Sequence, residues 1–107
     1  MGDQAGGIAG WADPRDPHQH YRKHGGQLGI TNADDFDASA RKTIEDGRPF
    51  TYRDPSTGED RTGYYDPITR RFTAVTDDPG EDEQFIVTHF ECDEQYVRDL
   101  PDSTYWA

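Results

Sequence analysis

A tight turn between two strands is encoded by Tyr65-Asp66-Pro67-Ile68-Thr69-Arg70-Arg71-Phe72. Proline presets the backbone for a turn, and an aspartate side chain can hydrogen-bond the main chain two residues further on. The residues that flank the turn alternate between apolar and polar, which is the period of a half-buried strand. This stretch therefore predicts a β-hairpin.

The same alternation continues on both sides of the hairpin. After Pro49 the apolar residues recur with a period of two, and Asp54-Pro55-Ser56-Thr57-Gly58 has the composition of a second hairpin turn. Residues 77–82 have the composition of an acidic solvent loop, which we expect between the last two strands. The predicted sheet is antiparallel, with strands at about residues 50–53, 61–66, 71–76 and 84–91.

Two helices are expected before the sheet. One is capped by Thr31 or Asn32 and ends at Gly47, and it buries a stripe of Phe36, Ala40 and Ile44. The other covers about residues 17–24, because Asp16-Pro17 can start a helix and Gly25-Gly26 can stop it. The expected fold class is α+β, with two N-terminal helices packed on a four-stranded antiparallel sheet.

The composition limits the size of the core. The chain has 107 residues and only 31% are hydrophobic, so we expect a single domain over residues 16–107, preceded by a linker or arm at residues 1–15. Aromatic residues make up 12% and can supply the missing burial. Several of them lie in the C-terminal tail, which we expect to pack back on the sheet. The single Cys92 excludes an internal disulfide and a multi-cysteine metal site.

The start of the chain lacks the pattern of a signal peptide, and no stretch approaches the ~18 apolar residues of a spanning helix. We therefore expect no membrane partner. If the protein leaves its cell, another element must carry it.

Histidines and cations cluster in His20-Tyr21-Arg22-Lys23-His24. Cleavage of RNA without a metal needs a base for the 2′-hydroxyl proton, an acid for the leaving 5′-oxygen, and donors for the charge that develops on phosphorus. On the predicted helix, His20 and His24 lie on one face and can supply the acid and the base. Arg53 or Arg71 can hold the phosphate, Thr88 can donate a hydroxyl hydrogen bond, and Tyr65 or Tyr96 can stack a base.

This combination resembles the toxin domains of the barnase, EndoU, colicin and RelE-like ribonuclease superfamily, which occur at the C-termini of polymorphic and contact-dependent inhibition toxins. The matching positions are His20, Lys23, His24, Gly25, Arg53, Tyr65, Asp66, Pro67, Thr69, Phe72, Val75, Ile86, Thr88 and Phe90. The resemblance implies a metal-independent endoribonuclease without a cofactor, neutralised by a cognate immunity protein. It also implies action in the cytoplasm of a target cell, after secretion or delivery as part of a larger toxin.

The predicted site therefore has two groups of residues. The catalytic group is His20, His24, Arg53 and Thr88; the substrate-binding group is Lys23, Tyr65, Arg71 and Tyr96. Alternation along the last strand allows only one of Thr88 and His89 to face the cleft. The resemblance favours Thr88, whereas residue type alone favours His89 as a base.

Other interpretations of these residues stay open. The two helical histidines are also typical of an exposed helix end, and they could bind zinc, although Tyr21 stands where a zinc protease has its glutamate. The net charge of −11 is the wrong sign for unspecific binding to RNA and fits an acidic protein-interaction module, such as an immunity or nucleic-acid-mimic protein. Alternatively, a chain with only two lysines and abundant aspartate has a halophile-like surface.

Overall fold

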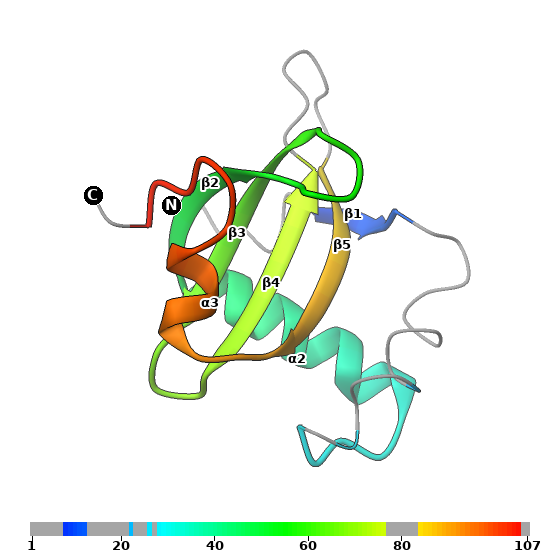
Figure 1. Cartoon of the computed structure of the whole chain (residues 1–107). Coiled ribbons are helices and arrows are strands. Elements are labelled where there is room, and N and C mark those ends of the chain that lie inside the picture. Colours follow the sequence, from blue (N-terminus) through cyan, green and yellow to red (C-terminus); the bar gives the residue numbers. More distant parts are fainter. Residues whose placement is uncertain (1–7, 13–21, 23–25, 27, 77–83, 106–107) are drawn as a thin grey trace.

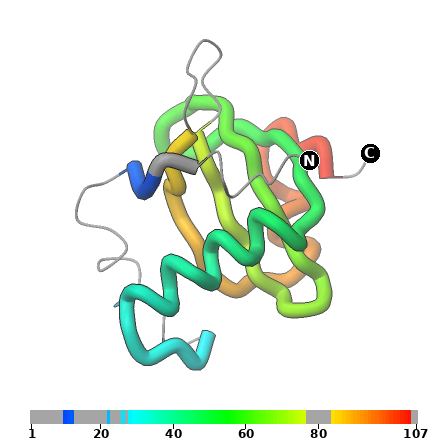
Figure 2. Tube along the Cα trace, turned by 180° about the vertical axis from the view of Figure 1, so that it is seen from behind, coloured from blue at the N-terminus to red at the C-terminus, as the bar shows by residue number. Residues whose placement is uncertain are grey.

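The computed structural model describes residues 8–12, 22, 26, 28–76 and 84–105. Five strands form one sheet in the order β1-β5-β4-β3-β2. Helix α2 covers one face of this sheet, and the short helix α3 with the C-terminal segment covers the other (Figures 1 and 2). The element bounds are β1 Ile8–Trp11, α2 Ala33–Asp46, β2 Arg48–Arg53, β3 Asp60–Asp66, β4 Arg71–Thr76, β5 Gln84–Glu91 and α3 Glu94–Arg98.

The predicted β-hairpin is confirmed between β3 and β4. Asp66 pairs with Arg71 at its closed end, and the Arg70 N–H donates to the Asp66 carbonyl at 2.7 Å. The Asp66 side chain accepts a further hydrogen bond from the Ile68 N–H at 2.9 Å. Arg70 takes a left-handed φ of 62°, which closes the turn before β4 begins.

The predicted architecture is wrong, although the fold is α+β. The sheet has five strands and is mixed, because β1 runs parallel to β5 with Trp11 opposite Ile86. Only one helix of seven or more residues is present in the described part of the chain. The helix expected over residues 17–24 falls on residues of which the structure describes only Arg22.

The missed strand lies inside the segment that was expected to be an arm. β1 has only four residues, and its register shifts between Ile8 and Gly10, where the φ of 156° favours glycine. Four residues interrupted by such a glycine are too short for a visible alternation. A parallel partner also needs no turn nearby in the sequence, so neither usual strand signal is present.

Helix α2 begins and ends as its local chemistry predicts. The Asn32 side chain accepts a hydrogen bond from the Asp35 N–H at 2.8 Å, which identifies Asn32 as the cap. At the other end the Gly47 N–H donates to the Thr43 carbonyl. The predicted stripe of Phe36, Ala40 and Ile44 is buried.

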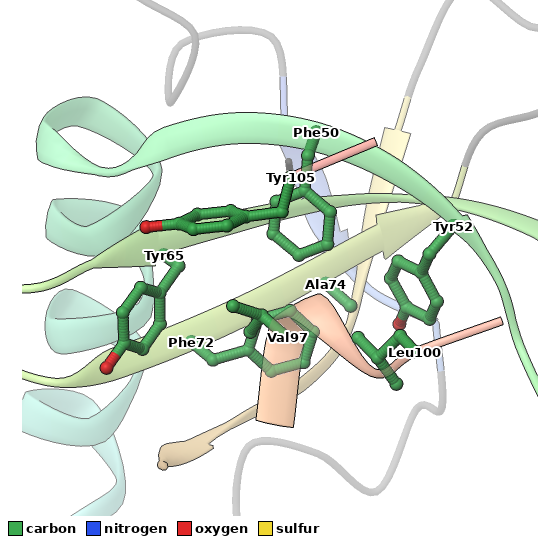
Figure 3. Close-up of a cluster of buried hydrophobic side chains, with 8 residues drawn as sticks. All are labelled: Phe50, Tyr52, Tyr65, Phe72, Ala74, Val97, Leu100 and Tyr105. Carbon is green, nitrogen blue, oxygen red and sulfur yellow. The ribbon is translucent and has the colours of Figure 1, made fainter. Parts of the chain in front are cut away.

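Two hydrophobic clusters lie on opposite faces of the sheet. The cluster under α2 consists of Ala40, Ile44, Tyr64, Val75 and Ile86, with Trp11 packed against it. The cluster under α3 is mainly aromatic and is drawn in Figure 3; it consists of Phe50, Tyr52, Tyr65, Phe72, Ala74, Val97, Leu100 and Tyr105. The tail residues Leu100 and Tyr105 therefore pack on the sheet, as predicted.

A bulge in β5 decides which residues face which cluster. Val75 pairs with Ile86 and Ala74 pairs with Thr88, so Val87 is an extra residue. Ile86 consequently packs in the cluster under α2, whereas simple alternation would put it on the same face as Thr88. Phe90, opposite Phe72, packs against the cluster under α3.

Candidate functional site

A hollow of about 360 Å³ opens on the α3 face of the sheet. Its lining comes from three parts of the chain: the end of β2 with the following turn, the middle strands β4 and β5, and the C-terminal segment that contains α3. The lining residues are Tyr52, Asp54, Pro55, Ser56, Phe72, Val87, Thr88, Phe90, Tyr96 and Leu100.

Three aromatic rings give the hollow a rigid apolar wall. Phe90 packs edge-on against Phe72, with ring centroids 5.3 Å apart, and against Tyr96 at 5.5 Å. Tyr96 also contacts Phe72 at 6.2 Å and is 44% exposed. The Asp93 side chain caps α3 by accepting from the Tyr96 N–H, which anchors the backbone that carries this ring.

The polar side of the hollow centres on Asp54. One carboxylate oxygen accepts a hydrogen bond from the Ser56 N–H at 2.8 Å, and the other forms an ion pair with Arg61 at 3.4 Å. Burial, followed by the charge of Asp54, raises the pKa of Tyr52. Burial also raises the pKa of Tyr96, with smaller contributions from Cys92 and Asp54. Both phenols are therefore protonated at neutral pH and carry an O–H donor.

Thr88 and Tyr96 are the predicted site residues that the structure brings together. They come from β5 and α3, and both line the hollow. His20, Lys23 and His24 lie outside the described residues.

Arg53 lies away from this pair. Its guanidinium group donates to Asp102 at 3.2 Å and forms an ion pair with Asp60 at 3.8 Å, in a smaller hollow of about 180 Å³. β2 and β5 are three strand spacings apart, about 14 Å. Thr88 is level with Phe50, three residues along β2 from Arg53, so the two backbones are also offset by about 10 Å along the strands. Arg53 and Thr88 are therefore not placed to contact one phosphate oxygen.

Arg71 and Tyr65 also have partners outside the hollow. Arg71 donates to the Ser39 hydroxyl at 2.8 Å and to the Leu28 carbonyl at 3.4 Å, so its guanidinium group lies toward α2. Tyr65 is buried in the cluster under α3 and donates its hydroxyl hydrogen to the Cys92 carbonyl at 2.9 Å. Burial raises the pKa of Tyr65 to about 12.

His89, the alternative to Thr88, is fully buried between α2 and the sheet. Its Nε2 lies 2.8 Å from the Ser39 hydroxyl, and its Nδ1 lies 2.7 Å from the Thr73 hydroxyl. Since Ser39 also accepts from Arg71, a continuous chain of polar contacts crosses the α2 face. Thr88 lines the hollow, and His89 holds the helix on the sheet.

The sequence pattern places Asp54 and Ser56 only in a turn and does not connect Tyr52, Phe72 and Phe90 with a site. The alternation of β2, β4 and β5 predicts which side chains share a face. It carries no information on where the C-terminal segment lies across that face. The walls of the hollow depend on that placement.

Carboxylates pair with most of the described cations. Ion pairs join Arg41 to Asp37, Lys42 to Asp46, Arg53 to Asp60 and Asp102, Arg61 to Asp54 and Glu59, and Arg98 to Glu94.

Arg53 lies opposite Asp60, whereas Arg71 lies opposite Asp66, at the other end of β3. Arg53 and Arg71 are thus about 20 Å apart along the sheet and form no common phosphate-binding patch.

Comparison of the chain with models of protein families, with curated proteins and with solved structures finds no match. The function must therefore be argued from the site. Among the described residues, no helix has the length and apolar character needed to cross a bilayer. In the same part of the chain, no three His, Cys, Asp or Glu side chains gather closely enough to hold a metal ion.

Proposed function

We propose that this chain is a metal-independent endoribonuclease of the toxin type, and that the hollow binds the nucleotide at the cleaved bond. One observation carries the proposal: Thr88 and Tyr96, given separate roles from the sequence, line the same hollow. The resemblance of the histidine and strand motifs to ribonuclease toxins, from which the role of Thr88 was taken, also supports it. On this proposal the domain acts in the cytoplasm of a target cell and is neutralised by an immunity protein.

The hollow offers an aromatic ring and a hydroxyl donor to such a substrate. An unpaired base stacks against Tyr96, whose exposed ring is supported by Phe90 and Phe72. Thr88, next to this wall on β5, donates its hydroxyl hydrogen to a phosphate oxygen as negative charge develops there. Arg53 and Arg71 have no role in this proposal, because their guanidinium groups have partners elsewhere.

Proton transfer is assigned to the histidines of the N-terminal motif. One of His20 and His24 takes the 2′-hydroxyl proton, and the 2′-oxygen then attacks the adjacent phosphorus. The other protonates the 5′-oxygen as its bond to phosphorus breaks, which leaves a 2′,3′-cyclic phosphate. Lys23, between the two histidines in the sequence, is the proposed phosphate contact.

The test is incubation of the purified protein with total RNA in chelator, at low and at molar salt, followed by gel analysis. Thr88→Val removes the hydroxyl and keeps the shape of the side chain, so we expect roughly 10²-fold slower cleavage with an unchanged melting temperature. Thr69→Val is the matched control, because Thr69 is exposed in the β3–β4 turn. Cleavage by Thr88→Val at the wild-type rate would contradict the proposed role of the hollow.

The histidine variants test the other half of the mechanism. We expect His20→Ala and His24→Ala each to lose about 10²- to 10⁴-fold in rate. His18→Ala is the control and should cleave normally. Loss of wild-type cleavage in chelator would indicate a metal enzyme instead.

A second candidate function is an acidic protein-interaction module. Two observations favour it: the net charge of the chain is −11, and five of the described cations already form ion pairs with carboxylates. Such a surface repels a polyanion at low salt. No cleavage under any salt condition would favour this function. Activity that is flat or rises toward molar salt would favour an acidic nuclease, because salt screens the repulsion between RNA and the carboxylates.

A further inference from the structure

Tyr96 is one of two large hydrophobic side chains that are exposed in the described part of the chain; the other is Ile68 in the β3–β4 turn. Ile68 lies on a turn, whereas Tyr96 forms the rim of a concave aromatic surface with Phe90. The face of an aromatic ring is electron-rich and attracts Lys and Arg side chains. The exposed Tyr96 ring therefore has the chemistry to attract a cation.

The charge around the hollow also favours a cation. Arg61 is shared between two carboxylates, those of Asp54 and Glu59, so this group of three carries a net charge of −1. Asp54 itself lines the hollow. Its charge reaches both phenols of the hollow, because it contributes to the raised pKa of Tyr52 and of Tyr96.

The charge of the whole chain acts in the same direction. With −11 overall, the protein attracts positively charged surfaces and speeds their association at low ionic strength. A basic partner is complementary to this surface, and the hollow is a place where one of its side chains can be desolvated against aromatic rings.

We propose that the hollow is the docking site of a basic segment of a partner protein, which inserts an arginine or lysine side chain beside Tyr96 and Asp54. Where the proposed ribonuclease function holds, this side chain excludes the base, and the partner is an inhibitor. The docking itself does not depend on cleavage. It requires only the aromatic wall and the carboxylate.

Binding can be measured without RNA. A short serine–arginine peptide is titrated into the ¹⁵N-labelled protein, with a serine–glutamate peptide of equal length as the control. We expect the arginine peptide alone to shift the amide signals of Thr88, Phe90 and Tyr96. Shifts confined to other surfaces, or equal effects of the two peptides, would overturn the proposal.

Variants identify the two parts of the site. Tyr96→Leu keeps an apolar side chain but removes the ring, and it should weaken binding of the arginine peptide roughly 2- to 30-fold. Asp54→Asn should weaken it as well. Asp60→Asn is the matched control, since Asp60 is an exposed carboxylate outside the hollow and should leave the affinity unchanged.

Because Asp54→Asn also removes a partner of Arg61, its melting temperature is measured alongside. Tyr96→Leu, at a half-exposed position, keeps the test valid if Asp54→Asn does not fold. Unchanged affinity in Tyr96→Leu would refute docking at this ring. If a short oligoribonucleotide shifts the same amides and the arginine peptide does not, the hollow is an RNA site alone and the docking proposal fails, while the ribonuclease proposal stands.

Discussion

Replacement of Gly63 by alanine should destabilise the protein through its aromatic core. Gly63 is buried in β3, opposite Phe50 in β2 and Ala74 in β4. An added Cβ would lie 2.6 Å from Cζ of Phe50 and 2.9 Å from Cε1 of Phe72. Real contacts of this kind are longer, so the rings would have to move.

The Phe50 ring has little space to retreat. Its centroid lies 5.3 Å from that of Tyr105 and 6.0 Å from that of Phe72. Overpacking of a core costs about 1–3 kcal/mol, and the loss of glycine freedom in the unfolded chain offsets about 0.4–1 kcal/mol of this. We therefore expect Gly63→Ala to lower the free energy of unfolding by about 1–2 kcal/mol, which corresponds to roughly 4–16 °C in melting temperature.

The assay is urea unfolding followed by fluorescence, with calorimetry for the melting temperature. Thr62→Ala, at the adjacent half-buried position, is the control and should cost less than about 1 kcal/mol. Adding Phe50→Leu to Gly63→Ala removes the closest ring atoms, so the double variant should be more stable than the sum of the single changes predicts. A wild-type melting temperature for Gly63→Ala, or strict additivity with Phe50→Leu, would refute this account of the core.

Four further predictions concern the scaffold. His89→Ala should lower the free energy of unfolding by about 2–4 kcal/mol in urea titrations, because it removes a fully buried ring and its hydrogen bonds with the Ser39 and Thr73 hydroxyls; a loss below about 1 kcal/mol would contradict a structural role. Asn32→Ala removes the cap of α2 and should cost ~1 kcal/mol by the same measurement, whereas an unchanged midpoint would show that this cap contributes nothing. Burial raises the pKa of Tyr65 from 10.0 to about 12, so the stability that its protonated phenol contributes is complete below pH 10 and is lost as the pH rises toward 12. Burial likewise raises the pKa of Cys92 from 9.0 to about 12, so its thiol should react slowly with a disulfide reagent at pH 8 until urea is added. The difference in phenolate absorbance between the wild type and Tyr65→Phe follows Tyr65, and a difference that titrates near pH 10 in the folded protein would contradict its burial.

Part of the candidate site was accessible from the sequence. The choice of Thr88 over His89 for the cleft came from a resemblance, and the structure places Thr88 in the hollow and His89 in the interior. Arg53 and Arg71, the two candidates for holding the phosphate, lie at opposite ends of β3. A strand pattern gives neither the order of the strands nor the register between them, so the sequence does not show this separation. The roles of His20 and His24 stay predictions.

The sequence by itself determined the elements whose signals are local. Asn32 and Gly47 mark the ends of α2, and Asp66-Pro67 marks the β3–β4 turn, because caps and turns are hydrogen bonds between residues a few positions apart. Only the tertiary structure decided the pairing of β1 with β5 and the extra residue Val87 in β5. These features depend on packing between segments that lie far apart in the chain, where the free energy of burial selects the register and short-range residue preferences carry little information.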